Sequence, residues 1–165
     1  MRKFYLLFFF FSHAVFGQNK NPFAVEVSFL RGNALPHTED MYHLVNGHPN
    51  GVMINFLKRS DGSKEWQRAY NYPDFGGYFL YQDFNSKPLG VNYSVGALYN
   101  FYFLNRKLQF KLSQGIAYTT NPYDKETNNK NNAFGTKVMD NTYFMLQYKK
   151  ENLFNRIGFQ AGFML

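Results

Sequence analysis

Three histidines and two carboxylates stand close together early in the chain, and these side chains could in principle bind a metal ion. The histidines are His37, His43 and His48, and the acids are Glu39 and Asp40. Histidine and carboxylate groups are common zinc ligands. The spacings between the histidines match no HExxH-like pattern, and a flexible loop would not hold ligands in place. We favour a hydrogen-bonded loop over a metal site, and we assign no metal ligand and no cofactor.

Serine ester hydrolysis needs a hydroxyl group within hydrogen-bond reach of a base. The chain contains no Gly-x-Ser-x-Gly elbow. The residues two positions after the four histidines are Val15, Glu39, Val45 and Asn50, so the chain also lacks a His-x-Ser pair. It contains no cysteine, which excludes thiolate chemistry. These residues do not by themselves indicate an enzymatic activity, and we assign no catalytic residue.

The start of the chain is typical of a secretory signal peptide. Arg2 and Lys3 form a short positive region, the apolar run Phe4–Phe11 follows, and Gly17 provides a small residue before a cut. A buried helix or a membrane anchor is the alternative. The apolar run is shorter than the roughly 20 residues that a spanning helix needs. We predict that residues 1–17 are removed and that the protein is exported.

Composition excludes several classes of protein. Aromatic residues make up 21% of the chain, yet the mean hydropathy is −0.44, so large apolar residues are mixed with many polar ones. Such a composition fits neither an intrinsically disordered protein nor a long coiled coil. The formal net charge is +7, without a block of five like charges. A basic surface suits nucleic acid or the phosphates of lipid headgroups, and predicted export argues against nucleic acid.

Apolar residues recur at every second position through most of the chain, as in β-strands. The clearest example is 90–104, where we predict that Asn92, Ser94 and Asn100 face inward. The opposite face of this segment is large and apolar, and it carries Tyr93, Val95, Tyr99, Phe101 and Phe103. Seven segments follow the pattern: 23–30, 52–57, 75–84, 90–104, 108–119, 142–149 and 156–165.

The polar face of these segments decides between two kinds of β protein. The strongest polar face, that of 90–104, carries small uncharged residues rather than the Lys, Glu and Thr of a water-exposed sheet. A transmembrane barrel predicts this arrangement, with apolar residues toward lipid and polar residues toward the lumen. A β-sandwich or a soluble lipocalin-like barrel is the alternative. We predict an all-β, antiparallel, up-and-down transmembrane β-barrel, and the predicted export supports that choice.

The connections between strands give mixed support. Asn105–Arg106 and Lys150–Leu153 are predicted as short hairpin turns, and Gly32–Asn50 and Asn121–Asn141 as long loops. Bacterial barrels alternate short periplasmic turns with longer outer loops. The connection after Arg59 is longer than this rule expects, and the next one is short.

Three blocks of the chain resemble the lipid A 3-O-deacylase (PagL-like) family, also called acyloxyacyl hydrolase. The longest block runs from Gly115 to Asp124 and continues through Asn128 to 131–135. A second block is Tyr72-Pro73-Asp74-Phe75-Gly76. The earliest block comprises Pro36-His37, Met41, His43-Leu44, Gly47-His48-Pro49 and Gly51. The resemblance spans roughly residues 23 to 165, with motifs of moderate specificity in a consistent order.

This resemblance implies an eight-stranded outer-membrane barrel that removes an ester-linked acyl chain from the lipid A of lipopolysaccharide. It implies a catalytic serine with a histidine and an acidic partner, and no metal. The family's His-x-Ser follows a strand like 158–165, where this sequence stops, so no catalytic residue carries over. We expect residues 18–165 to be the N-terminal part of the barrel, with about seven strands, inactive alone.

Two other functions stay open at this point. One is a non-catalytic outer-membrane barrel, and the other is a soluble periplasmic barrel that binds an apolar ligand. We expect lipid A and membrane lipid as partners, and no nucleic acid.

Overall fold

The fold was analysed in a computed structural model of the chain. The structure describes residues 22–165, except residues 37, 46, 155 and 156. The predicted signal peptide, residues 1–17, lies outside the described residues, so its removal stays a prediction.

Seven β-strands form a single antiparallel sheet in which each strand pairs with its neighbours in the chain. The strands are β1 (Phe23–Arg31), β2 (Asn50–Arg59), β3 (Asp74–Asp83), β4 (Val91–Phe103), β5 (Leu108–Thr119), β6 (Val138–Phe154) and β7 (Ile157–Met164). This order confirms the predicted all-β, up-and-down arrangement. The period-two pattern located every strand because the side chains of a strand alternate between the two faces of its sheet.

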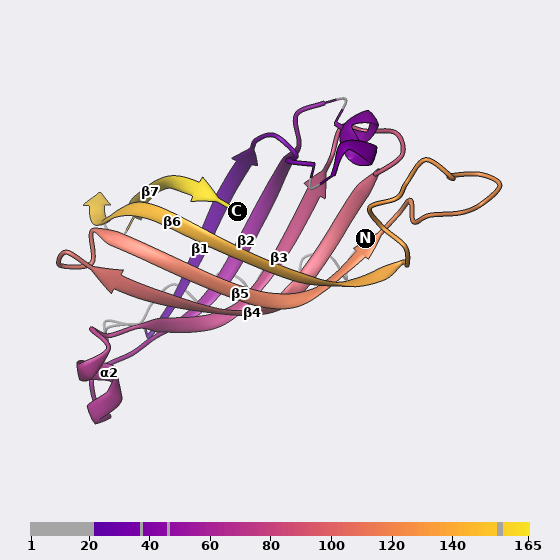
Figure 1. The fold of residues 1–165 in the computed structure, drawn as a ribbon. Coiled ribbons are helices and arrows are strands. Elements are labelled where there is room, and N and C mark those ends of the chain that lie inside the picture. Colours follow the sequence, from indigo (N-terminus) through magenta and orange to yellow (C-terminus); the bar gives the residue numbers. More distant parts are fainter. Residues whose placement is uncertain (1–21, 37, 46, 155–156) are drawn as a thin grey trace, which may run out of the picture.

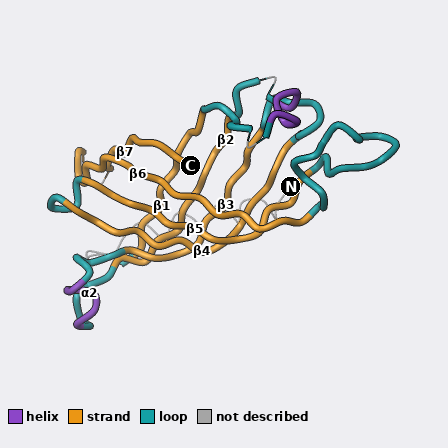
Figure 2. Tube along the Cα trace, viewed as in Figure 1, coloured by secondary structure: helices purple, strands orange, loops and turns teal. Residues whose placement is uncertain are grey.

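The sheet curls so far that β7 comes to lie opposite β1, which gives a half-barrel (Figure 1). The two edge strands do not pair through their backbones, but Gln160 of β7 donates a hydrogen bond of 2.8 Å to Ser28 of β1. Two short helices, η2 (Glu39–Leu44) and α2 (Glu65–Ala69), lie in connections at opposite ends of the strands (Figure 2). Among the described residues, no helix is long and apolar enough to cross a membrane.

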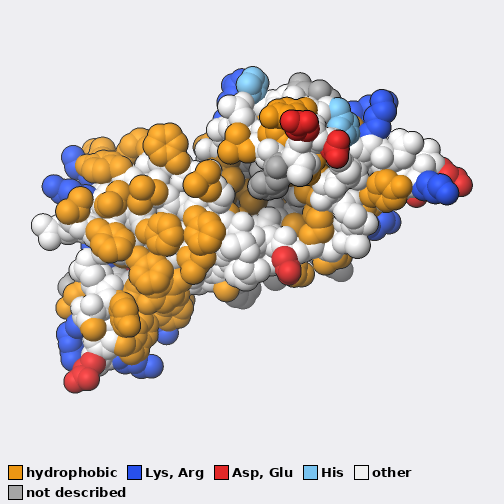
Figure 3. Space-filling view, viewed as in Figure 1, with side chains coloured by type: hydrophobic (Ala, Val, Ile, Leu, Met, Phe, Trp, Pro, Cys, Tyr) orange, Lys and Arg blue, Asp and Glu red, His pale blue; other side chains and the backbone are white. Residues whose placement is uncertain are grey.

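The two faces of the sheet have the predicted chemistry. In β4, Asn92, Ser94 and Asn100 are buried on the inner face, whereas Tyr93 and Val95 are exposed on the outer face. Val95 is 49% exposed and Ser94 is 1% exposed, although the two residues are adjacent. Hydrophobic side chains gather over the strands, and most charged side chains lie toward the ends (Figure 3). This distribution is inverted relative to a protein that hides its apolar residues from the surroundings.

Small residues on the inner face make room for large ones. Tyr78 of β3 lies against Gly96 and Gly115, where an added Cβ would come within 2.8 Å and 2.5 Å of the Tyr78 ring and hydroxyl oxygen. Its ring packs edge-on against Tyr143, with 5.0 Å between centroids. The buried apolar cluster around these rings also includes Met53, Leu57, Leu80, Leu98 and Met145. The apolar core therefore occupies only part of an otherwise polar interior.

Both predicted long loops are present, although β6 already begins at Val138, and one of the two predicted short turns is wrong. The turn at Asn105–Arg106 is confirmed, and both residues adopt positive φ values of 55° and 63°. The turn predicted at Lys150–Leu153 is wrong, because β6 continues to Phe154 and its pairing with β7 shifts register between Lys150 and Phe154. The apolar alternation fades there, so the pattern could not reveal the end of the strand. The longer connection after β2 contains α2.

Candidate functional site

Charged side chains meet inside the half-barrel and link five of its strands. We call this group the lumen charge cluster: Glu26, Asp74, Tyr102, Arg106, Lys111 and Lys149. Glu26 of β1 accepts hydrogen bonds from Lys111 of β5 at 3.0 Å and from Lys149 of β6 at 2.8 Å. Lys111 is completely buried, and Glu26 is nearly so. A single carboxylate thus ties the first strand to the fifth and sixth.

The cluster continues from Lys149 toward the end of the barrel that carries α2. Lys149 donates to the Tyr102 hydroxyl at 3.1 Å, and this hydroxyl donates to Asp74 at 2.7 Å. Arg106 pairs with Asp74 at 3.0 Å, and its guanidinium lies 3.7 Å from the centre of the Tyr102 ring. Glu151 adds an acid within 3.5 Å of Arg106. These contacts neutralise most of the buried charge, as buried ions require.

The sequence prediction missed this cluster. Lys111 and Lys149 both occupy inward-facing positions of their strands, and the alternation of side chains along a strand was the signal that could have found them. Asp74 lies within the block 72–76 that carries the family resemblance, and Gly76 in the same block is held so close to β2 that a Cβ would collide with the Phe56 carbonyl oxygen. The separation of Glu26 from Lys149 by 123 residues hid the pairing itself.

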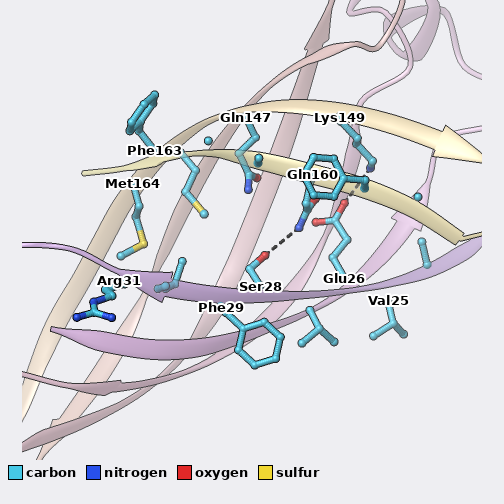
Figure 4. Close-up of a pocket in the computed structure, with 18 of the residues that line it drawn as sticks. Val25, Glu26, Ser28, Phe29, Arg31, Gln147, Lys149, Gln160, Phe163 and Met164 are labelled. Carbon is cyan, nitrogen blue, oxygen red and sulfur yellow. Dashed lines mark hydrogen bonds and ion pairs between the residues drawn. The ribbon is translucent and has the colours of Figure 1, made fainter. Parts of the chain in front are cut away.

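A large open cavity of about 1420 Å³ lies between β1, β6 and β7. Glu26, Ser28, Gln160 and Lys149 point into it, whereas Val25 and Phe29 of β1 point away (Figure 4). The edge strands β1 and β7 border this opening without a backbone ladder between them. In β7, Phe159, Ala161 and Phe163 share one exposed face, whereas Gln160 between them is half-buried.

The two described histidines of the predicted hydrogen-bonded loop make hydrogen bonds to other loop residues. His43 Nε2 lies 2.6 Å from the carbonyl oxygen of Lys130, in the connection between β5 and β6. His48 Nδ1 lies 2.6 Å from the side-chain oxygen of Asn33. His37 lies outside the described residues. Across the described part of the chain, no three His, Cys, Asp or Glu side chains are grouped as metal ligands.

The long loop between β5 and β6 is built by asparagine side chains. Asn128 and Asn131 donate to the backbone carbonyls of Asn121 and Pro88, with distances between 2.6 and 3.2 Å. Asn131 is fully buried, and its side-chain oxygen accepts from the backbone amides of Ala133 and Phe134. The asparagine side chains therefore form the scaffold of the predicted long loop.

Two loop carboxylates have lowered pKa values. Hydrogen bonds from the Thr127 amide and hydroxyl, and from the Glu126 amide, lower the pKa of Asp124. The Ser63 amide lowers the pKa of Asp61 in the connection that contains α2. Both carboxylates are therefore ionised at neutral pH and act as acceptors for turns.

Comparison with known families identifies one match. The family model described as "Lipid A 3-O-deacylase (PagL)" matches residues 50–165. Comparison with curated proteins and with solved structures found no match. The matched region includes the blocks 72–76 and 115–135, but of the early block it includes only Gly51. Because the match covers more than half of the chain, the protein belongs to the lipid A 3-O-deacylase (PagL) family.

Proposed function

We propose that this protein is an outer-membrane lipid A deacylase, a serine esterase that removes an ester-linked acyl chain from lipopolysaccharide. The observation that carries the proposal is the family match over residues 50–165. The curled sheet supports it, since an apolar outer face suits contact with lipid and a polar inner face suits a lumen. Residues 1–17 would direct export and be removed.

The proposed catalytic residues lie two and four positions beyond Leu165, in a continuation of β7, and one further strand would fill the opening between β1 and β7. The 165 residues contain no His-x-Ser pair, and β1 and β7 each have an unpaired edge. Bacterial single-chain barrels have even numbers of strands, so one further strand would complete this one. Continuing the outward parity of Phe159, Ala161 and Phe163 would place a His and a Ser, two residues apart, together on the lipid-facing side.

There the histidine would take the proton of the serine hydroxyl as it attacks the acyl ester, and a carboxylate would orient the histidine. Lipid A lies in the membrane. A nucleophile on the outer face of the barrel therefore reaches the acyl ester while the lipid A molecule stays in the membrane. On this proposal, the 165 residues alone are a barrel fragment without activity.

The test is mass spectrometry of lipid A incubated in detergent with two proteins. One is the 165-residue chain, and the other is the same chain extended by the segment encoded after Leu165. We expect loss of one acyl chain only with the extended protein. Acyl loss with the shorter chain would contradict the placement of the nucleophile. No acyl loss with a folded extended protein would favour a non-catalytic barrel.

The inner face argues against the soluble alternative. A periplasmic barrel that binds an apolar ligand needs an apolar interior. Here Glu26, Lys111 and Lys149 occupy the interior, and the large exposed apolar residues face outward. Folding of the purified protein in buffer without detergent or lipid would favour the soluble alternative.

A further inference from the structure

A basic pocket lies among the loops at the end of the barrel opposite α2. Its volume is about 910 Å³, and three lysines line it: Lys87 from the connection between β3 and β4, and Lys130 and Lys137 from the loop between β5 and β6. His43 of η2 and one acid, Asp124, also border it. We call it the lysine pocket. Long loops mark the extracellular end of bacterial barrels, which places this pocket at the outer surface.

The backbone of each lysine is held by a hydrogen bond from another part of the loop region. The Asn121 side chain donates to the Lys87 carbonyl at 2.9 Å. The Thr119 amide donates to the Lys137 carbonyl at 2.9 Å, and His43 contacts the Lys130 carbonyl at 2.6 Å. The three loops are thus locked together, and the positions from which the lysine side chains extend are set before any ligand binds.

The charges of these lysines are not neutralised by the protein. Within the described residues, none of the three forms a salt bridge, whereas Lys111 and Lys149 in the lumen both pair with Glu26. The single acid of the pocket is engaged elsewhere, because Asp124 Oδ1 accepts three hydrogen bonds from its own turn. The lysine pocket therefore has a net positive charge, while the buried cations of the barrel are balanced.

We propose that the lysine pocket binds a phosphate group of the lipid A headgroup at the outer surface of the membrane. This inference rests on the proposed function, which supplies lipid A as the substrate. Lipid A is a phosphorylated, acylated disaccharide, and clustered ammonium groups are suitable partners for phosphate. Binding the headgroup here would hold the lipid at a fixed height relative to the outer face of the strands, where its acyl esters would be cleaved.

The test measures binding, so it does not depend on hydrolysis. The 165-residue chain, folded in detergent, is titrated with micelles that contain either phosphorylated lipid A or lipid A from which the phosphates have been removed. The variants are Lys87→Gln, Lys130→Gln, Lys137→Gln and the triple variant. Lys125→Gln is the matched control, because Lys125 lies in the same loop but does not line the pocket.

Each pocket lysine near an anionic surface is worth about a fivefold change in affinity, so the triple variant should bind phosphorylated lipid A about 100-fold more weakly. Lys125→Gln should change the affinity little, and phosphate-free lipid A should bind weakly to every variant. Circular dichroism checks that each variant is folded. Equal affinity for the two lipids, or an equal loss with Lys125→Gln, would overturn the proposal.

Two further arms separate related explanations. If inorganic phosphate saturates the pocket and lipid A cannot displace it, the pocket is a free-phosphate site and the headgroup assignment is wrong. If the extended protein removes acyl chains but the triple variant binds and cleaves both lipids alike, the inference fails while the proposed function holds. If binding depends on the lysines but the extended protein cleaves nothing, only the proposed function fails.

Discussion

At the scale of single residues, the interior of this barrel depends on close fits and on charge balance. Glycines at 96 and 115 leave space for Tyr78, and Glu26 balances two buried lysines. Neither role can be recognised from the residue itself, because each depends on a side chain that belongs to another strand. Substitutions at these positions should therefore cost much more than similar substitutions at exposed sites.

A methyl group at Gly115 should destabilise the barrel. The Cβ of Gly115→Ala would lie 2.5 Å from the Tyr78 hydroxyl oxygen and 2.7 Å from the Gly96 Cα. Overpacking of this kind costs about 1–3 kcal/mol. The measurement is a urea unfolding titration in lipid vesicles. Gly135→Ala is the control, because no atom lies within 4 Å of its added Cβ. Equal stability of the two variants would contradict the packing of Tyr78.

Removing the charge of Glu26 should also be costly. Glu26→Gln leaves Lys111 buried without its carboxylate, and an uncompensated buried charge costs about 3–5 kcal/mol. The control is Glu65→Gln on α2, where the side chain is exposed. Adding Lys111→Met to Glu26→Gln should restore much of the loss, because it removes the stranded charge. A loss below about 1 kcal/mol for Glu26→Gln alone in the unfolding titration would show that the ion pair is not a structural requirement.

At the scale of elements, each strand presents one face to the lumen and the other outward. The register is continuous between β1 and β5, so the inner and outer faces stay aligned from strand to strand. A one-residue slip would move every apolar side chain to the wrong face, which is why such a sheet tolerates only one register. On the proposed membrane location, the cost of placing a charged side chain on the outer face should therefore depend on its depth in the membrane.

Arginine on the outer face should be most disruptive near the middle of a strand. Val95 lies within β4, opposite Ile116, whereas Val138 begins β6 at the outer end of the barrel. Val95→Arg should cost about 2–4 kcal/mol in vesicles, and Val138→Arg about 1 kcal/mol or less. Folding titrations that show equal costs for both variants would argue against a lipid-facing surface, since both side chains are exposed.

At the scale of the whole molecule, the opening between β1 and β7 is the main departure from a closed barrel. A side-chain hydrogen bond between Gln160 and Ser28 crosses it, while every other neighbouring pair of strands is joined by a backbone ladder. An exposed edge strand is a template for pairing with a further strand. The proposed additional strand would separate the two residues.

Cross-linking can measure that separation. The chain has no cysteine, so Ser28→Cys together with Gln160→Cys introduces a single pair of thiols. We expect oxidation to form a disulfide in the 165-residue chain, because the two side chains are in contact. The extended protein should not form it, since an inserted strand would move β1 and β7 about 9–10 Å apart, twice the usual spacing. Gln160→Cys alone is the control. Equal disulfide yields in the two proteins would contradict the insertion of a strand.

The sequence by itself determined the secondary structure and the chemistry of the two faces. Period-two alternation is a local property, because neighbouring residues of a strand always point to opposite sides. It therefore located all seven strands and the inward positions of Asn92, Ser94 and Asn100. The turn at Asn105–Arg106 could be predicted for the same reason, because a short turn depends on neighbouring residues. The end of β6 could not be predicted in this way, because pairing with β7 extends the strand beyond the apolar pattern.

Only the tertiary structure decided which distant residues meet. Glu26 reaches Lys111 and Lys149 because the curl of the sheet brings β1 across the lumen from β5 and β6. Pairing of β4 with β5 places the two connections that carry Lys87, Lys130 and Lys137 side by side, where they line one pocket. No local pattern encodes the contacts of Glu26, since they depend on the summed twist and curvature of the strands between β1 and β6.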